Sequence, residues 1–194
     1  RGLSLIYPVE GEVVTTLAPE FSWESGSDTL DGFLRYEFNL GQDWDLSDAV
    51  VINTINSTYI PDENLLENTS YNWFVAAVFD TGSATLSDTT YFYTNSYNEA
   101  PRSFNLNSPF EGEVLITSTP TFTWNNAHDP DPGSPATQYH LVFGEHPESL
   151  DRIWTGAYRE VTLSIELEEN IAYYWSVYAE DNYGLITQNE GGNR

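Results

Sequence analysis

Hydrophobic residues recur at every second position through several short stretches of the chain. Residues 34–40 and 161–165 alternate between apolar and polar side chains, and residues 71–77 keep Tyr, Trp, Val and Ala at every second position. In a β-strand successive side chains point to opposite faces, so this period of two is typical of strands with one buried face. Turn-forming Gly, Pro, Asn and Asp residues separate the stretches, and no window has a helical stripe. The pattern predicts an all-β chain of short antiparallel strands.

The chain contains the same unit twice. Residues 8–14 (PVEGEVV) recur as residues 109–115 (PFEGEVL), and residues 71–77 (YNWFVAA) recur as residues 173–179 (YYWSVYA). The offset stays near one hundred residues, which is the length of a small β-sandwich and far longer than the repeat of a solenoid. The repeat therefore indicates the tandem duplication of a whole domain.

The domain boundaries follow from this duplication. We predict a first domain over residues 1–96, a short linker over residues 97–102 and a second domain over residues 103–194. Pro101 fixes one backbone dihedral of the linker, so we expect limited hinge motion. The chain begins at Arg1 without a methionine, which indicates a processed or excised piece.

The repeated residues resemble fibronectin type III-like domains, as found in tandem on bacterial and archaeal surface or secreted proteins. The resemblance covers nearly the whole chain and implies two tandem antiparallel β-sandwiches. It implies that Tyr71 and Tyr173 form tyrosine corners, in which the hydroxyl bonds to backbone upstream. The repeated tryptophans are then core residues and not a platform for glycans; they are Trp23, Trp73, Trp124 and Trp175.

The second copy departs from the first near its end. The first copy continues from Gly82 to the aromatic stretch 91–93, whereas the second copy reaches Arg194 where the matching stretch should begin. We therefore expect the second sandwich to lack most of its last strand. Two explanations stay open: the chain is cut before this strand, or another chain supplies it by pairing with the exposed edge. The segment 3–7 is one candidate donor, although it also suits the first strand of its own unit.

The charge of the chain excludes some classes of partner. The chain has 30 acidic residues, six arginines and no lysine, which gives a net charge of -24. Nucleic acids and anionic membrane surfaces are bound through clustered Lys and Arg, so neither is an expected partner. The absence of cysteine excludes disulfides, thiol catalysis and thiolate metal sites. No stretch is apolar for long enough to predict direct insertion into a membrane.

One acidic loop is a candidate calcium site. Asp129 and Asp131 alternate with prolines, and a sandwich would bring Asp181 and Glu99 to the same pole of the second domain. Calcium prefers six to eight oxygen ligands, including carboxylates. The alternative is a solvated turn that the prolines stiffen, since no EF-hand spacing is present. No cofactor is otherwise required.

Trp44 is the candidate residue for a ligand or partner, because it lies between two aspartates in an expected loop. The alternative is a side chain that folds back over the sheet edge. We expect Trp154 to be a strand residue and His140 to point to solvent. No zinc-binding histidine pair and no nucleophile elbow is present. The sequence therefore predicts no catalytic site.

These features predict a non-catalytic structural or adhesive module of an extracellular or cell-surface protein. It would act as a rigid spacer or as an interaction pair, with other domains of the same protein or neighbouring copies as partners. One alternative is a pilus-like filament subunit that assembles by strand complementation. The other is an accessory carbohydrate-binding module with a glycan on Trp44. Function must come from sites, because this fold carries many functions.

Overall fold

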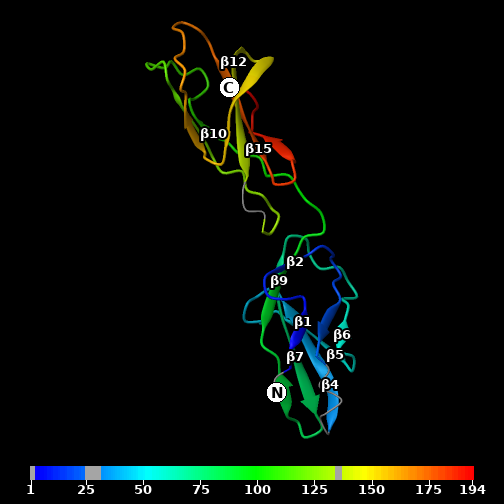
Figure 1. Cartoon of the computed structure of the whole chain (residues 1–194). Helices are drawn as coiled ribbons and strands as arrows, with labels where there is room; N and C mark the ends of the chain where they lie inside the picture. Colours follow the sequence, from blue (N-terminus) through cyan, green and yellow to red (C-terminus); the bar gives the residue numbers. More distant parts are fainter. Residues whose placement is uncertain (1–2, 25–31, 134–136) are drawn as a thin grey trace. The chain divides into compact units, whose positions relative to one another are not determined.

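The computed structural model describes residues 3–24, 32–133 and 137–194, so Arg1 lies outside the described residues. All regular elements in these ranges are β-strands (Figure 1). The chain divides into two compact units, Arg1–Tyr97 and Asn98–Arg194. Each unit has two sheets of mostly antiparallel strands, so the predicted all-β class with two tandem β-sandwiches is confirmed.

Unit 1 is a sandwich of two sheets. A sheet of three strands has the order β1-β3-β6, and the second sheet has the order β2-β9-β7-β4-β5 with β8 beside β7. All neighbours are antiparallel except β2 and β9, which are parallel. The strands are β1 (Leu5–Tyr7), β2 (Glu12–Val14), β3 (Phe21–Trp23), β4 (Phe33–Gly41), β5 (Val50–Thr54), β6 (Thr58–Tyr59), β7 (Ser70–Phe79), β8 (Ala84–Leu86) and β9 (Thr90–Thr94).

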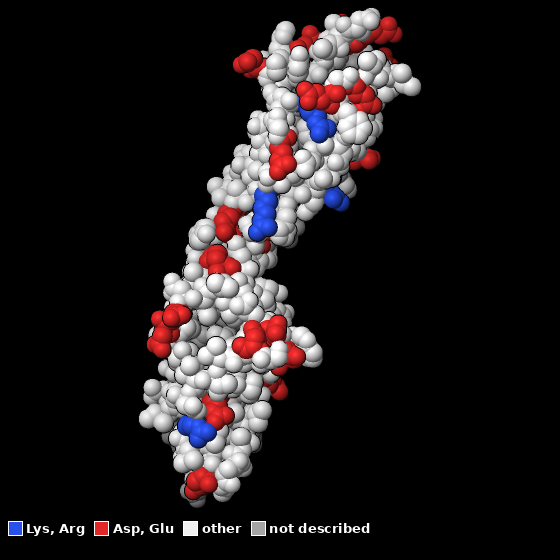
Figure 2. Space-filling model, turned by 180° about the vertical axis from the view of Figure 1, so that it is seen from behind, with Lys and Arg blue, Asp and Glu red and all other residues white. Residues whose placement is uncertain are grey.

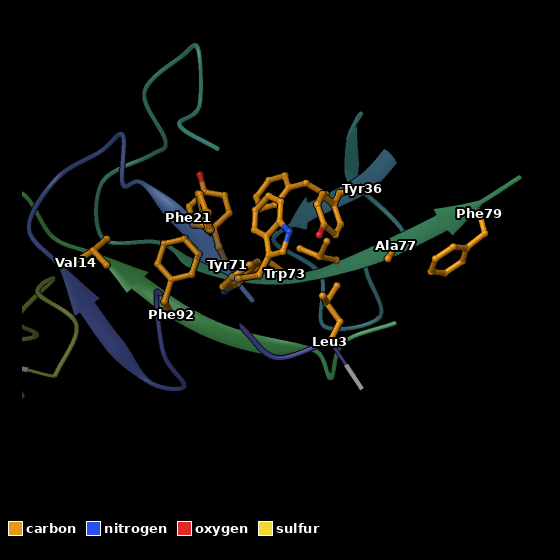
Figure 3. Close-up of a cluster of buried hydrophobic side chains, with 12 residues drawn as sticks. Leu3, Val14, Phe21, Tyr36, Tyr71, Trp73, Ala77, Phe79 and Phe92 are labelled. Atoms are coloured by element: carbon orange, nitrogen blue, oxygen red, sulfur yellow. The ribbon is translucent and has the colours of Figure 1, made fainter. Parts of the chain in front are cut away.

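The inward positions of these strands form one aromatic core. Phe21 is fully buried, and its ring centroid lies 5.0 Å from Trp73 and 5.4 Å from Phe92, both in edge-to-face contact. Such aromatic pairs add about 0.5–1.5 kcal/mol beyond the burial of their area. Figure 3 shows these side chains between the strands, with Val14 and Phe92 at one end of the cluster. The core therefore depends on β9 as well as on the central strands.

Unit 2 repeats this arrangement with fewer strands. Its sheets have the orders β10-β11-β14 and β13-β12-β15-β16. Its core again consists of alternate residues, with Trp124, Tyr139, Leu141, Trp175 and Val177 all buried. The strands are β10 (Leu106–Ser108), β11 (Thr121–Trp124), β12 (Gln138–His146), β13 (Ser149–Gly156), β14 (Glu160–Thr162), β15 (Tyr174–Glu180) and β16 (Ile186–Gln188).

The last strand of the sandwich is divided into two parts, β8 and β9, in unit 1. Unit 2 has only one described part, β16. In unit 1, β8 pairs with one end of β7 and β9 pairs with the other. In unit 2, β16 pairs with the end of β15 that matches the β8 end, and no described strand corresponds to β9. The expected gap in the second sandwich is thus confined to the second half of its last strand.

Both units contain a tyrosine hydroxyl that bonds to backbone five residues upstream. The amide of Leu66 donates to the hydroxyl of Tyr71 at 2.9 Å, and the amide of Glu168 donates to the hydroxyl of Tyr173 at 3.1 Å. Each bond fixes the loop before the central strand of its unit. Tyr71 is buried beside β9, whereas Tyr173 is half-buried and no described strand of unit 2 lies at the position of β9.

Candidate functional site

Three of the four predicted calcium ligands lie together in unit 2. The amide of Asp131 donates to Asp129 Oδ1 at 3.0 Å, and the amide of Glu99 donates to Asp131 Oδ2 at 3.1 Å. The carboxyl group of Glu99 also lies within hydrogen-bonding reach of Asp131. The loop and the start of unit 2 therefore meet at the side chain of Asp131.

Asp131 is in an environment that disfavours its charge. Its side chain is buried, with 5% exposed, and its Oδ1 atom is buried without a hydrogen-bond partner. Burial is the main cause that raises its pKa to about 6, and the neighbouring carboxyl groups of Glu99 and Asp129 raise it further. A carboxylate in such surroundings is neutralised by a proton or by a cation.

Asp181 has a separate structural role. Asn98 Nδ2 donates to its Oδ2 at 2.6 Å, and the amides of Tyr183 and Leu185 each donate to its Oδ1 at 2.8 Å. Burial opposes its ionisation, but these hydrogen bonds outweigh burial and lower its pKa. Asp181 thus holds the turn between β15 and β16 and fixes Asn98 at the start of the unit.

The described residues contain no group of three His, Cys, Asp or Glu side chains arranged to hold a metal ion. The oxygens of Asp181 are already used by three donors, which leaves Asp131 as the residue with an unused buried oxygen. Calcium binding by Asp129, Asp131, Asp181 and Glu99 stays a prediction.

Trp44 lies on a loop of unit 1 with its side chain in solvent. The residue is 83% exposed, which is unusual for so large an apolar side chain. The loop joins β4 to β5, and the matching connection of unit 2 is a tight hairpin in which His146 faces Ser149. Trp44 therefore belongs to a feature that only unit 1 has.

Hydrogen bonds hold this loop in one conformation. The carboxylate of Asp48 accepts from the amides of Gln42 at 2.9 Å and Asp43 at 3.1 Å, and these bonds lower the pKa of Asp48. A Cβ atom on Gly41 would lie 2.4 Å from Asp48 Oδ1, so glycine is needed for the close approach. The arrangement presents the indole of Trp44 on a fixed turn.

His140 contradicts the sequence-based expectation, because it is buried and not solvent-facing. It is 2% exposed, although it lies on the outer face of its sheet between the core residues Tyr139 and Leu141. Its Nδ1 atom lies 2.9 Å from Thr155 Oγ1, and its Nε2 atom lies 2.5 Å from Glu180 Oε2. Alternation along the strand predicted the face correctly but gave no sign of the cross-strand neighbours that cover the ring.

A hydroxyl, an imidazole and a carboxylate in this order are also the parts of a nucleophilic triad. In this chain Thr155 lies within β13, directly opposite His140 in the β12–β13 ladder. The three residues form a hydrogen-bonded network across the sheet.

Trp154 is a strand residue, as expected. It lies in β13 and its ring contacts Trp124 with 5.8 Å between centroids. A cavity of unit 2 has a volume of about 360 Å³ and is lined by residues that include Glu180 and Asp181. It does not include Trp154, Thr155 or His140.

The acidic side chains are distributed in small groups. Figure 2 shows them scattered over the visible face, with few arginines between them. No helix among the described residues is long and apolar enough to cross a membrane. A dispersed negative surface supports solubility and does not by itself define a binding site.

No protein-family model matches this chain, and no curated protein matches it. It is similar to several solved structures at low identity. The fibronectin(III)-like modules of Clostridium thermocellum CbhA are 16% identical, with 96% of this chain and 90% of that chain covered and a TM-score of 0.40. The FN1-FN3 domains of chicken CNTN1 are 14% identical, with 100% and 65% covered and a TM-score of 0.36. A three-domain fragment of titin is 16% identical, with 98% and 64% covered and a TM-score of 0.42.

Proposed function

We propose that this chain is a non-catalytic structural module of an extracellular or cell-surface protein. Its two sandwiches act as a spacer that limits hinge motion and presents loops to partners. The repeated aromatic residues serve the two cores, so the repeat itself supplies folding and not chemistry. The partners are neighbouring domains or neighbouring copies.

The observation that carries this proposal is the anchoring of the residues between the two cores. The amides of Ser96 and Tyr97 donate to Glu67 Oε1 at 2.6 and 3.3 Å within unit 1. Asn98 and Glu99 are bonded within unit 2, and the amide of Arg102 donates to the carbonyl of His128 at 2.8 Å. Few residues are left free to act as a hinge, which supports a spacer over a flexible tether.

Paired labels test the spacer directly. The chain has no cysteine, so Asp88→Cys and Glu148→Cys place one label on each unit without side reactions. We expect a narrow distance distribution by pulsed EPR. Glu67→Ala removes the bonds to Ser96 and Tyr97 and should broaden it, whereas Glu63→Ala, which removes an exposed charge of the same unit, should not. The proposal would be contradicted if the labelled chain that keeps Glu67 gave a distance distribution as broad as that of the Glu67→Ala variant.

Trp44 supports a second candidate function, the binding of a glycan or a protein through unit 1. Its indole is exposed on a turn that is already ordered, so binding would cost little conformational entropy. Screening polysaccharides by affinity electrophoresis with the unaltered chain and with Trp44→Ala tests this. A polysaccharide that retards the unaltered chain but not Trp44→Ala supports glycan binding through Trp44. If no polysaccharide retards either protein, glycan binding is excluded as the function of this residue.

A further inference from the structure

The larger sheet of unit 1 has one side against the core and one side towards solvent. Tyr36 and Phe38 of β4 are buried in the core, so the residues that alternate with them lie on the solvent side. The register of β4 with β7, and of β7 with β9, continues that side across the central strands of the sheet (Figure 1). Its central residues, which we call the outer face, are Arg35, Glu37, Asn39, Asn72, Phe74 and Tyr91.

The outer face is electrically neutral on a strongly acidic chain. The chain has 30 acidic residues and a net charge of -24. At the outward positions of the described strands β4, β5, β7, β8 and β9, the charged residues are Arg35 and Glu37, whose charges cancel. They form an ion pair of 2.5 Å, and Arg35 Nε also donates to Asn53 Oδ1 at 2.8 Å. An uncharged ligand therefore meets no unpaired charge on this face.

The amide side chains of the outer face are held in place and still have atoms available to a ligand. Asn39 Nδ2 donates to the carbonyl of Glu37 at 3.1 Å, and Asn72 Nδ2 donates to the carbonyl of Gln42 at 3.2 Å. In both amides Oδ1 has no hydrogen-bond partner among the described residues. Such an oxygen can accept a hydrogen bond from a ligand hydroxyl. Because the side chains are already fixed, binding costs little side-chain entropy.

Two aromatic rings lie beside these amides. Tyr91 faces Asn72 across the β7–β9 ladder, and Phe74 faces Asn39 across the β4–β7 ladder. Tyr91 is 36% exposed, and Phe74 is half-buried. The ring of Tyr91 also stands edge-to-face to Tyr93, with 5.9 Å between centroids, which restrains its orientation. Each ring of the outer face therefore has an amide as its direct neighbour on the next strand.

Unit 2 shows that the sandwich does not dictate these residues. The repeat keeps the buried aromatic residues of the two cores but changes the outward positions. Ser176 stands at the position of Phe74, and Val142 stands at the position of Asn39. Ser176 is fully buried and donates to Asn189 Oδ1 at 2.6 Å, so the matching position of unit 2 is closed by its own hydrogen bonds. The rings and amides of the outer face thus belong to unit 1 alone.

We propose that the outer face binds an uncharged polysaccharide. A sugar ring has an apolar C–H face that packs on an aromatic side chain, and hydroxyl groups that both donate and accept hydrogen bonds. An extended chain of such rings matches a sheet face on which aromatic rings and amides lie side by side. This inference rests on the second function proposed above, glycan binding through unit 1, and names the ligand as an uncharged polymer.

Other classes of partner fit the outer face less well. Nucleic acids and anionic glycans are repelled by the net charge of -24, and the outer face has no net positive charge to offset it. A second copy of this chain carries the same charge. A protein partner would have to pair each amide with a group in a fixed position or leave it buried without a partner. Sugar hydroxyls rotate to suit the amides, so an uncharged glycan avoids both costs.

Affinity electrophoresis with uncharged polysaccharides tests this inference directly. The probes are hydroxyethylcellulose, xyloglucan, galactomannan and arabinoxylan, and carboxymethylcellulose is the anionic counterpart of the first. We expect at least one uncharged polysaccharide to retard the 194-residue chain, and we expect no retardation by carboxymethylcellulose. The inference is overturned if no uncharged polysaccharide retards the chain, or if carboxymethylcellulose retards it as strongly.

Two substitutions locate the site. Phe74→Ser and Asn39→Val give unit 1 the residues that unit 2 has at the same positions, so the sandwich should accept them. Each should weaken binding of the retarding polysaccharide about tenfold. The control Ile6→Ser removes an exposed apolar side chain of β1, in the other sheet, and should leave binding unchanged. Urea unfolding verifies that each variant is folded. Equal binding by the unaltered chain and by both outer-face variants would overturn the inference.

The outcomes separate this inference from the earlier proposals. Loss of binding in Trp44→Ala alone would leave the site on the Trp44 loop and overturn the outer face, whereas loss in Phe74→Ser but not in Trp44→Ala would support the outer face without Trp44. A sedimentation coefficient that rises with concentration for the unaltered chain, but not for Phe74→Ser, would assign the face to a second copy and overturn the inference. The label distances test the spacer separately.

Discussion

Replacing Asp131 by asparagine should stabilise unit 2 at neutral pH. The carboxyl group of Asp131 is buried next to Glu99, and its pKa is raised from 3.8 to about 6. The folded protein therefore holds a proton on Asp131 more strongly than the unfolded chain does. The stability that this group contributes is greatest at low pH and is lost as the pH rises from about 4 through about 6.

The magnitude follows from the two pKa values. Relative to a group that stays neutral, the carboxyl group of Asp131 lowers the free energy of unfolding by about 3 kcal/mol at pH 7.5. At pH 5 the folded carboxyl is mostly protonated, and the free energy of unfolding is lowered by about 1.5 kcal/mol. Asparagine resembles the protonated acid, and its carbonyl can still accept from the amide of Glu99. Asp131→Asn should thus raise the free energy of unfolding by up to about 3 kcal/mol at pH 7.5 and by about half of that at pH 5.

Urea unfolding of both proteins at pH 5 and pH 7.5 measures this difference. As a control, Asp151→Asn removes an exposed charge of β13 and should change the free energy of unfolding by the same amount at pH 5 and at pH 7.5. An Asp131→Asn gain that is the same at both pH values, or a loss at pH 7.5, would refute the reasoning. Added calcium gives a further result: if the predicted site exists, calcium stabilises the unaltered chain at pH 7.5 and has less effect on Asp131→Asn.

Three further substitutions test the packing and the Trp44 loop. Phe92→Ala should destabilise unit 1 by about 3–5 kcal/mol in chemical denaturation, because it leaves a cavity beside Phe21. Tyr71→Phe should cost about 1 kcal/mol in the same assay, because the amide of Leu66 loses its acceptor. Trp44→Ala should change the stability by less than about 0.5 kcal/mol and should remove the fluorescence component that acrylamide quenches most readily, because the side chain is in solvent.

Alternation and repetition were enough to predict the two sandwiches, but not that β16 forms the first half of the last strand in the second one. The stretch 34–40 lies in β4 and the stretch 71–77 lies in β7, since a period of two with large apolar residues suits no other element. The duplication then exposed the difference at Arg194, because each position of the second copy could be compared with the first. Local pattern and repeat together thus predict the strands of a sandwich.

Contacts between distant residues were less accessible from the sequence. The parallel pairing of β2 with β9 joins segments about eighty residues apart, and no local pattern encodes it. The burial of His140 depends on Thr155 and Glu180 from neighbouring strands, so its own strand predicts only the face. Charge counting also could not distinguish Asp181, which is fully bonded, from Asp131, which has an unused oxygen.

The measurement that tests the spacer most directly is ¹⁵N relaxation of the unaltered chain in solution. It gives a rotational correlation time for each unit separately, from amides in β4 and β7 of unit 1 and in β12 and β15 of unit 2. If the anchored linker suppresses hinge motion, both units should show one correlation time, that of a particle with the mass of the whole chain. Two shorter correlation times, each that of a particle of about half this mass, would contradict the account.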